Sequence, residues 1–168
     1  MSSIKIVTDS TCDIPDYLLR QYEISVVPLQ VQVNDELYLD RVAINSAELF
    51  RRLDGRGPGA ATTHPPPLPT FERLFRNLTR QGDVLVITVS NKLSETYATA
   101  LRAREGLGAT TAAHIAVVDS LSVSMGLGLI VLAAAKAARS GRYSLTELAS
   151  MVQRMTTQTH VVFFAETY

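Results

Sequence analysis

The stretch Val84-Leu85-Val86-Ile87-Thr88-Val89, followed by Ser90-Asn91-Lys92-Leu93-Ser94, decides the fold class. An unbroken apolar run of this length is typical of a strand that is buried on both faces of a sheet. Gly82-Asp83 precedes the run as a turn, and the polar segment behind it leads into a helix expected to reach about Glu105. Strand, turn and helix in this order form the basic unit of a parallel α/β sheet.

Strands and helices alternate on both sides of this unit. Ile4–Val7 is a strand that ends at Thr8-Asp9-Ser10, and Ile115–Val118 is a buried strand that ends at Asp119-Ser120. A last strand is expected at Val161–Phe164. The expected helices are Pro15–Gln21, Phe71–Leu78, Ser122–Arg139 and, after a capping box of Ser144 and Glu147, Ser144–Gln158. The pattern predicts an α/β fold with a mostly parallel sheet covered by helices on both faces.

The segment between the first strand and residue 70 is less regular. Ile24–Val33 is a strand-like run whose Pro28 predicts a bend or an edge position. Asn34-Asp35 predicts a hairpin turn, after which Glu36–Leu39 returns along the preceding strand. Asn45 or Ser46 caps a helix to about Leu53. Residues 54–69, rich in glycine and proline, are expected to be a loop.

Composition narrows the class of protein. The 168 residues suit one domain, or one domain and the start of another. The 16 basic and 16 acidic residues balance, so nothing favours nucleic acid or an anionic membrane as a partner.

The sequence also predicts a cytoplasmic location. Cys12 is the single cysteine, so no intramolecular disulfide can form and a reducing compartment is expected. The longest apolar stretch, Met125 to Ala138, is too short to cross a bilayer and contains Lys136, so no stable membrane insertion is expected. The N-terminal MSSIKIVTDS lacks the apolar core of a signal peptide.

Polar clusters occupy the places where ligands bind in open α/β sheets, at the carboxyl ends of strands. Hydroxyls and free N–H groups at helix starts favour an anion, so a carboxylate or phosphate is the expected ligand. The alternative is that Ser90, Ser94 and Asp119 are only N-caps and turn residues. The candidate ligand-binding residues are Asp9, Ser10, Thr62, Thr63, Ser90, Asn91, Ser94, Thr96, Asp119 and Ser120.

Signatures of catalysis are weak. The sequence contains no Gly-x-Ser-x-Gly elbow, and its three histidines stand in unrelated surroundings, so a hydrolase triad is not expected. No metal-ligand spacing recurs, so no metal and no cofactor are expected. Gly126-Leu127-Gly128 lies inside a helical run, where small residues allow close packing. A small-molecule phosphotransferase or hydrolase that uses Asp9 or Asp119 stays open as the alternative.

The sequence resembles the DegV family, and the matches cover essentially the whole chain. Each matched segment occurs in the family's order and at its spacing. The segments are Ile6–Pro15, Val26–Leu29, Tyr38–Asp40, Thr62–Pro65, Ser90–Tyr97, Val118–Ser120 and Ser124–Gly128.

This resemblance implies the N-terminal α/β domain (residues 1–168) of a carrier that binds a long-chain fatty acid and is not an enzyme. The family binds the acid between two domains and presents it to a fatty acid kinase, which phosphorylates its carboxylate. We therefore expect a second, C-terminal lipid-binding domain to be missing from this chain. A truncated domain with only an interaction role is a further alternative, and it predicts an exposed apolar face.

The resemblance also implies which residues approach the ligand. Thr62 and the Ser90-Asn91 pair are expected to approach the carboxylate, while the acyl chain lies along apolar side chains. Three positions depart from the family pattern: Asn91 stands for a serine, Glu95 for a glycine and His64 for a glutamine. The charge of Glu95 would oppose binding of an anion if it faced the carboxylate.

Overall fold

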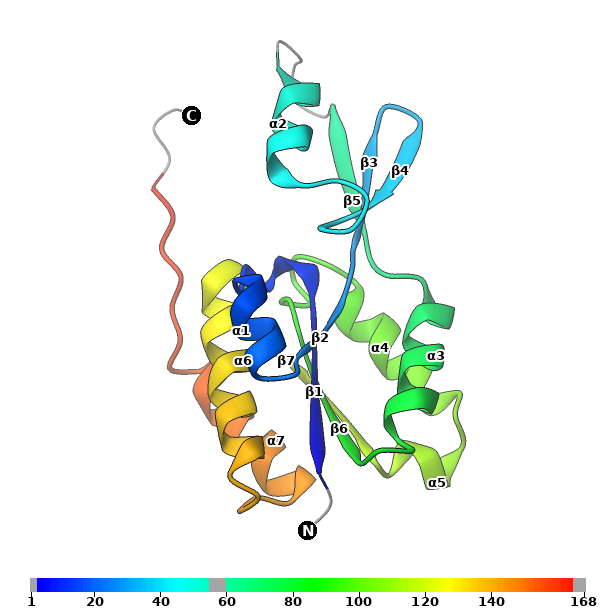
Figure 1. Cartoon of the computed structure of the whole chain (residues 1–168), viewed down its shortest axis with the longest axis vertical. Helices are drawn as coiled ribbons and strands as arrows, with labels where there is room; N and C mark the ends of the chain where they lie inside the picture. Colours follow the sequence, from blue (N-terminus) through cyan, green and yellow to red (C-terminus); the bar gives the residue numbers. More distant parts are fainter. Residues whose placement is uncertain (1–2, 55–59, 165–168) are drawn as a thin grey trace.

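A four-stranded parallel sheet forms the centre of the structure, a computed structural model that describes residues 3–54 and 60–164 (Figure 1). The strands lie in the order β2-β1-β6-β7. Their bounds are β1 Ile4–Asp9, β2 Ser25–Val27, β6 Asp83–Thr88 and β7 Ile115–Asp119. The predicted parallel sheet is thus confirmed, with the apolar run 84–89 in one of its inner strands.

Helices cover both faces of this sheet, as predicted. Because side chains alternate along a strand, Leu85 and Ile87 of β6 face one layer, and Val84 and Val86 face the other. The first layer contains α1 (Asp16–Gln21), α6 (Ser124–Arg139) and α7 (Leu145–Thr156), and the second contains α3 (Leu68–Leu78) and α4 (Thr96–Glu105).

Close packing of α6 depends on two glycines. The short 3-10 helix η1 (Ser10–Cys12) follows β1 and packs on α6. A Cβ atom at Gly128 would lie closer than 3.0 Å to the carbonyl oxygen of Cys12. A Cβ atom at Gly126 would collide in the same way with the side chains of Ser122 and Val161. The expectation that these small residues allow close packing is confirmed.

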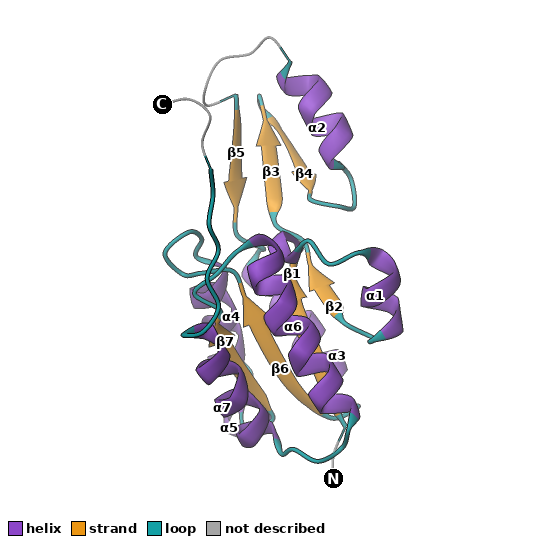
Figure 2. Ribbon diagram, turned by 90° about the vertical axis from the view of Figure 1, so that its left-hand side faces the viewer, coloured by secondary structure: helices purple, strands orange, loops and turns teal. Residues whose placement is uncertain are grey.

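A second, smaller sheet stands above the carboxyl edge of the first (Figure 2). This unit, residues 30–54 and 60–64, is called the arm below. Its antiparallel strands lie in the order β4-β3-β5, with β3 at Gln30–Val33, β4 at Glu36–Leu39 and β5 at Ala61–His64. Helix α2 (Ser46–Leu53) covers one face, and the enclosed core is small: Val31, Val33 and Ile44, with Tyr38, Leu49 and Ala61 partly buried.

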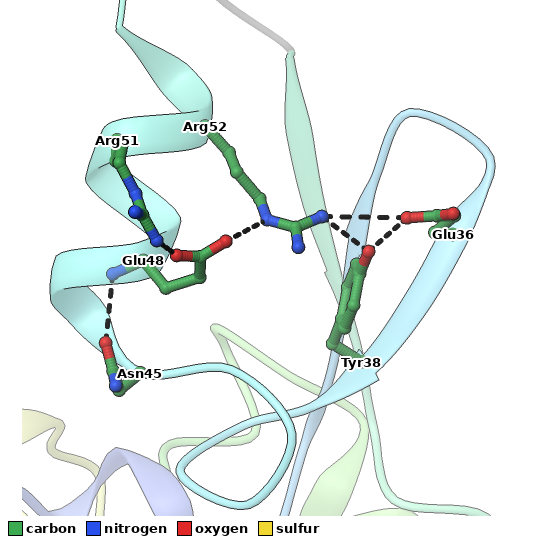
Figure 3. Close-up of polar contacts among 6 residues, drawn as sticks. All are labelled: Glu36, Tyr38, Asn45, Glu48, Arg51 and Arg52. Atoms are coloured by element: carbon green, nitrogen blue, oxygen red, sulfur yellow. Dashed lines mark hydrogen bonds and ion pairs between the residues drawn. The ribbon is translucent and has the colours of Figure 1, made fainter.

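Besides this small core, charged side chains connect α2 to the β3–β4 hairpin through hydrogen bonds and ion pairs (Figure 3). Arg52 donates from Nε to Glu48 Oε1 (2.6 Å) and from Nη1 to the hydroxyl of Tyr38 (2.5 Å). Its guanidinium lies 4.8 Å from the centre of the Tyr38 ring, and Glu36 bonds to the same hydroxyl. Glu36 therefore raises the pKa of Tyr38, because it accepts a hydrogen bond from the protonated phenol.

The base of the arm is hydrogen-bonded to the parallel sheet and its helices, which together are called the body below. The backbone N–H of Leu29 donates to Ser10 Oγ (3.1 Å). Arg41 donates to the carbonyl oxygen of Ile14 (2.9 Å) and to Asp16 Oδ1 (2.7 Å). The arm is thus fixed beside η1 and α1 at the end of β1.

Several local predictions are confirmed and others are wrong. The hairpin at Asn34-Asp35, the N-cap Asn45 and the capping box of Ser144 with Glu147 are all present. The predicted loop 54–69 contains strand β5, while residues 55–59 lie outside the described part of the chain. Val161–Phe164 forms no strand, because it pairs with neither sheet, and the short helix α5 (Ala109–Ala112) was not predicted. No helix within residues 3–54 and 60–164 is long and apolar enough to cross a membrane.

Candidate functional site

Strands β1, β6 and β7 end at the same edge of the parallel sheet, below the arm (Figure 2). Thr88 of β6 pairs with Asp119 of β7, and Thr8 of β1 pairs with Ile87 of β6. The loops that follow these strands carry most of the candidate residues. The sheet register therefore brings together the predicted polar clusters at Asp9-Ser10, Ser90–Thr96 and Asp119-Ser120, whereas Thr62 and Thr63 lie in the arm.

Asp9 is buried and its carboxylate is bonded by its own chain. Its Oδ2 accepts from the N–H of Val89 (2.6 Å), and its Oδ1 accepts from the N–H (3.1 Å) and hydroxyl (2.6 Å) of Thr11. Burial raises the pKa of Asp9, although these hydrogen bonds oppose the shift. Asp9 thus joins the β1 and β6 loops, and Ser10 beside it accepts from the N–H of Leu29.

Asp119 has a similar structural role. Its carboxylate accepts from the N–H of Asn91 (3.2 Å to each oxygen) and from that of Leu121 (2.9 Å). Ser120 follows it as a buried turn residue, whose hydroxyl donates to the carbonyl of Ser122 and accepts from the N–H of the same residue. These bonds hold the loop after β6 against the loop after β7.

Ser90 begins the loop that leads into α4. Its backbone N–H donates to the carbonyl oxygen of Ser122 (2.8 Å), and its hydroxyl accepts from the N–H of Lys92 (3.3 Å). Ser94 accepts from the N–H of Thr96 (3.3 Å), and the two hydroxyls are 2.9 Å apart. Thr96 is fully buried, whereas Ser94 is half-buried and Glu95 is exposed. Ser94 thus accepts a hydrogen bond from the first N–H group of α4.

A pocket of about 380 Å³ opens beside Ser90. Ser90, Ser122 and Thr159 contribute hydroxyl-bearing side chains, and Lys92 and His160 contribute nitrogen-bearing ones. The apolar lining residues are Leu93, Leu121, Val123, Val161 and Phe163. The pocket therefore combines hydrogen-bond donors with an apolar wall, and Glu95 is not part of its lining.

Sequence reasoning missed several residues of this pocket, above all Ser122. Its hydroxyl is buried and has no hydrogen-bond partner, in contrast to that of Ser120. The alternation of hydroxyls in Ser-Leu-Ser-Val-Ser at 120–124 is the signal that could have identified it.

Thr62 and Thr63 do not line this pocket. In β5 they pair with Gln32 and Val31 respectively, so their side chains point to opposite faces of the small sheet. Both threonines are exposed, and Thr62 lines a separate hollow of about 260 Å³ in the arm with Gln32. At most one of them can face any single ligand group on that sheet, and their role in binding stays a prediction.

Ser10 likewise lines a different pocket. This one, of about 480 Å³, lies between η1 and the arm, with Asp40 and Arg41 among its lining residues. Arg41 is already bonded to the body through Asp16. The pocket thus marks the junction of arm and body.

Groups that could support other chemistry are dispersed. Among residues 3–54 and 60–164, no three His, Cys, Asp or Glu side chains are placed to hold a metal ion. His114 bonds to Asp83 (2.7 Å) and His64 to Gln32 (3.0 Å). Burial raises the pKa of the Cys12 thiol, which disfavours the reactive thiolate.

The fold and this edge define an α/β protein with a parallel sheet covered on both faces and polar loops gathered at the carboxyl ends of its strands. The family model described as "Uncharacterised protein, DegV family" matches residues 3–168. The chain belongs to the DegV family.

Curated relatives support this assignment. A DegV domain-containing protein of Clostridium acetobutylicum is 36% identical over 143 residues, which are 84% of this chain and 50% of that protein. Another, of Deinococcus radiodurans, is 31% identical over 165 residues, covering 98% of this chain and 57% of that protein. The chain thus spans about half the length of the curated relatives that it matches.

Solved structures show the same fold. A DegV family protein from Thermus thermophilus, described as binding fatty acid, aligns with a TM-score of 0.81 and 30% identity, over 92% of this chain and 54% of that one. DegV from Bacillus subtilis, described as a fatty acid binding protein, aligns with a TM-score of 0.83 and 25% identity, over 94% and 55% of the two chains.

Proposed function

We propose that this chain binds a long-chain fatty acid, with the carboxylate at the pocket beside Ser90. The observation that carries the proposal is the mixed lining of that pocket, in which buried hydroxyls adjoin exposed apolar side chains. A fatty acid has the same division into a charged head and an apolar tail. The two structural relatives described as binding fatty acid support the assignment.

The hydroxyl end of the pocket suits a carboxylate. Ser90 accepts a bond from Lys92 N–H, so its own O–H remains to donate to an anion. Lys92 and His160 line the same pocket; the positive charge of Lys92 would offset that of the ligand, and a ring N–H of His160 could donate to it. Glu95, which departs from the family pattern, is exposed and outside the lining, so its charge does not face the proposed carboxylate.

The apolar wall suits the acyl chain. Leu93, Leu121 and Phe163 are 65%, 54% and 73% exposed, which is unusual for side chains of this size gathered around one pocket. Covering them with an alkyl chain contributes about 0.8 kcal/mol for each CH₂ group that leaves water.

The chain would act as a cytoplasmic carrier that presents the bound acid to a fatty acid kinase. The two carboxylates considered for catalysis, Asp9 and Asp119, already accept hydrogen bonds from backbone N–H groups of neighbouring loops. Using either as a base would disrupt the loops that it joins, so a partner that supplies the phosphoryl chemistry fits better than a phosphotransferase or hydrolase in this chain.

Mass spectrometry of an organic extract of the purified chain tests the proposal, followed by calorimetric titration with palmitate after the lipid is removed. We expect extracted fatty acid, binding of palmitate, and at least a tenfold loss of affinity for Ser90→Ala. Ser140→Ala is the matched control, because its hydroxyl bonds only to backbone groups of Ala137 and Arg142 at the far end of α6 and does not line the pocket. An empty extract together with no heat of binding would refute the proposal. Added fatty acid kinase should phosphorylate palmitate faster with the wild-type chain than without it.

A further inference from the structure

Ser122 has a hydroxyl that the fold itself does not use. In the described part of the chain, three buried side-chain oxygens have no hydrogen-bond partner, on Thr8, Thr88 and Ser122. Ser122 is the one of these three that lines the pocket beside Ser90. A buried hydroxyl without a partner lowers the stability of the folded state. Its position at a pocket therefore suggests that a ligand supplies the missing partner.

The backbone of Ser122, in contrast, is fully engaged. Its N–H donates to Ser120 Oγ (3.1 Å), and its carbonyl oxygen accepts from the N–H of Ser90 (2.8 Å) and from Ser120 Oγ (3.2 Å). These bonds fix Ser122 beside Ser90 before any ligand arrives. The main chain that carries the unpaired hydroxyl is therefore ordered before the ligand binds, which lowers the entropic cost of binding.

Gly126 provides the space that this hydroxyl occupies. A Cβ atom there would collide with Ser122 Oγ and with Val161 Cγ2. The segment that contains Val161 runs beside the helical layer toward the arm (red in Figure 1). Ser122 thus lies between α6 and this segment, and it lines the same pocket as Val161 and Phe163 of the segment.

We infer that Ser122 is a second hydroxyl donor to the bound carboxylate and acts together with Ser90. The inference rests on the proposed function, because it assigns a further residue to the same pocket. A carboxylate has two oxygens and accepts up to four hydrogen bonds, so two hydroxyls on adjoining loops can each bond to it. The ligand would complete the one hydrogen bond that the folded chain leaves unmade at this position.

Ser122→Ala, measured for both stability and binding, tests this inference. Loss of an unpartnered hydroxyl should leave the thermal midpoint unchanged or raise it, while the affinity for palmitate should fall at least tenfold. Ser144→Ala is the matched control: its hydroxyl caps α7, so this variant should lower the thermal midpoint and bind palmitate as the wild type does.

The outcomes separate the inference from the proposed function. If the wild type binds palmitate and Ser122→Ala binds it equally well, the inference fails and the proposed function stands. If the wild type binds no palmitate, both fail. If Ser122→Ala does not fold, then Ser122→Cys, which keeps the size of the side chain but weakens the donor, should bind several-fold more weakly than the wild type. Equal binding by Ser122→Cys would overturn the inference.

Discussion

Replacing Gly128 by alanine should destabilise the chain, although alanine is the better helix former. In the interior of a helix, alanine is favoured over glycine by about 1 kcal/mol. The new Cβ would lie closer than 3.0 Å to the carbonyl oxygen of Cys12, 3.1 Å from Ile14 Cγ1 and 3.3 Å from Met125 Sδ. The nearest obstacle is backbone, so α6 and η1 must move apart.

The segment around Cys12 is poorly able to move. It follows Asp9, which is bonded to β6, and Ser10, which is bonded to Leu29. Overpacking of a constrained core costs about 1–3 kcal/mol. Because the nearest obstacle is backbone, we take the upper part of this range, and after the gain in helix propensity we expect a net loss of up to about 2 kcal/mol in the free energy of unfolding.

Urea unfolding followed by circular dichroism measures this loss. Gly126→Ala is the matched comparison on the same helix, because the three atoms nearest to its Cβ belong to the side chains of Ser122 and Val161 and not to the backbone. Gly126→Ala should therefore lose less stability than Gly128→Ala. If Gly128→Ala were as stable as the wild type, the close contact between α6 and η1 would not be a constraint on the fold.

Two further changes test the arm and the sheet edge. Arg52→Met should speed hydrogen exchange of the α2 amides and lower the free energy of unfolding by less than about 1 kcal/mol, since exposed ion pairs are weak. Arg51→Met is its control, because it removes a contact with Glu48 alone. Equal exchange rates in the two variants would exclude a special role for Arg52. Asp9 has a raised pKa, so the folded state holds its proton more tightly than the unfolded chain. Tighter binding of this proton therefore stabilises the folded state below about pH 4, and the stabilisation is lost as the pH rises through the native pKa of Asp9. The free energy of unfolding of the wild type, minus that of Asp9→Asn, should fall over this range in urea titrations; a rise would contradict the assigned shift.

The fold could be predicted where the local pattern and the tertiary environment agree. The run 84–89 is apolar on both faces because α3 and α4 cover one side of β6 and α6 and α7 the other. The two wrong strand predictions have a common cause, because a segment becomes a strand only where a neighbouring strand pairs with it. β5, Ala-Thr-Thr-His, lacks an apolar pattern and is a strand because β3 pairs with it. Val161–Phe164 has the apolar composition of a strand but pairs with no strand of either sheet, and Phe164 is 92% exposed.

The sequence predicted where in the fold the candidate site lies, but not which of its side chains are available to a ligand. Ligands in such sheets bind at the carboxyl ends of strands, and the candidate clusters of β1, β6 and β7 are indeed neighbours. The sequence could not show which polar groups are used up by the fold. Asp9 and Asp119 are bonded to neighbouring loops, while the hydroxyl of Ser122 is left unpaired. Such differences depend on atoms brought together from distant parts of the chain.

The pairing at the base of the arm makes that unit separable. Gln30 lies directly opposite His64, so the chain enters and leaves the arm through neighbouring residues. Paired residues on antiparallel strands have Cα atoms about 4.5–5.5 Å apart, a gap that a tight two-residue turn can close. We therefore expect that the arm can be replaced by a short turn while the main sheet, whose four strands all lie outside residues 30–64, keeps its pairing.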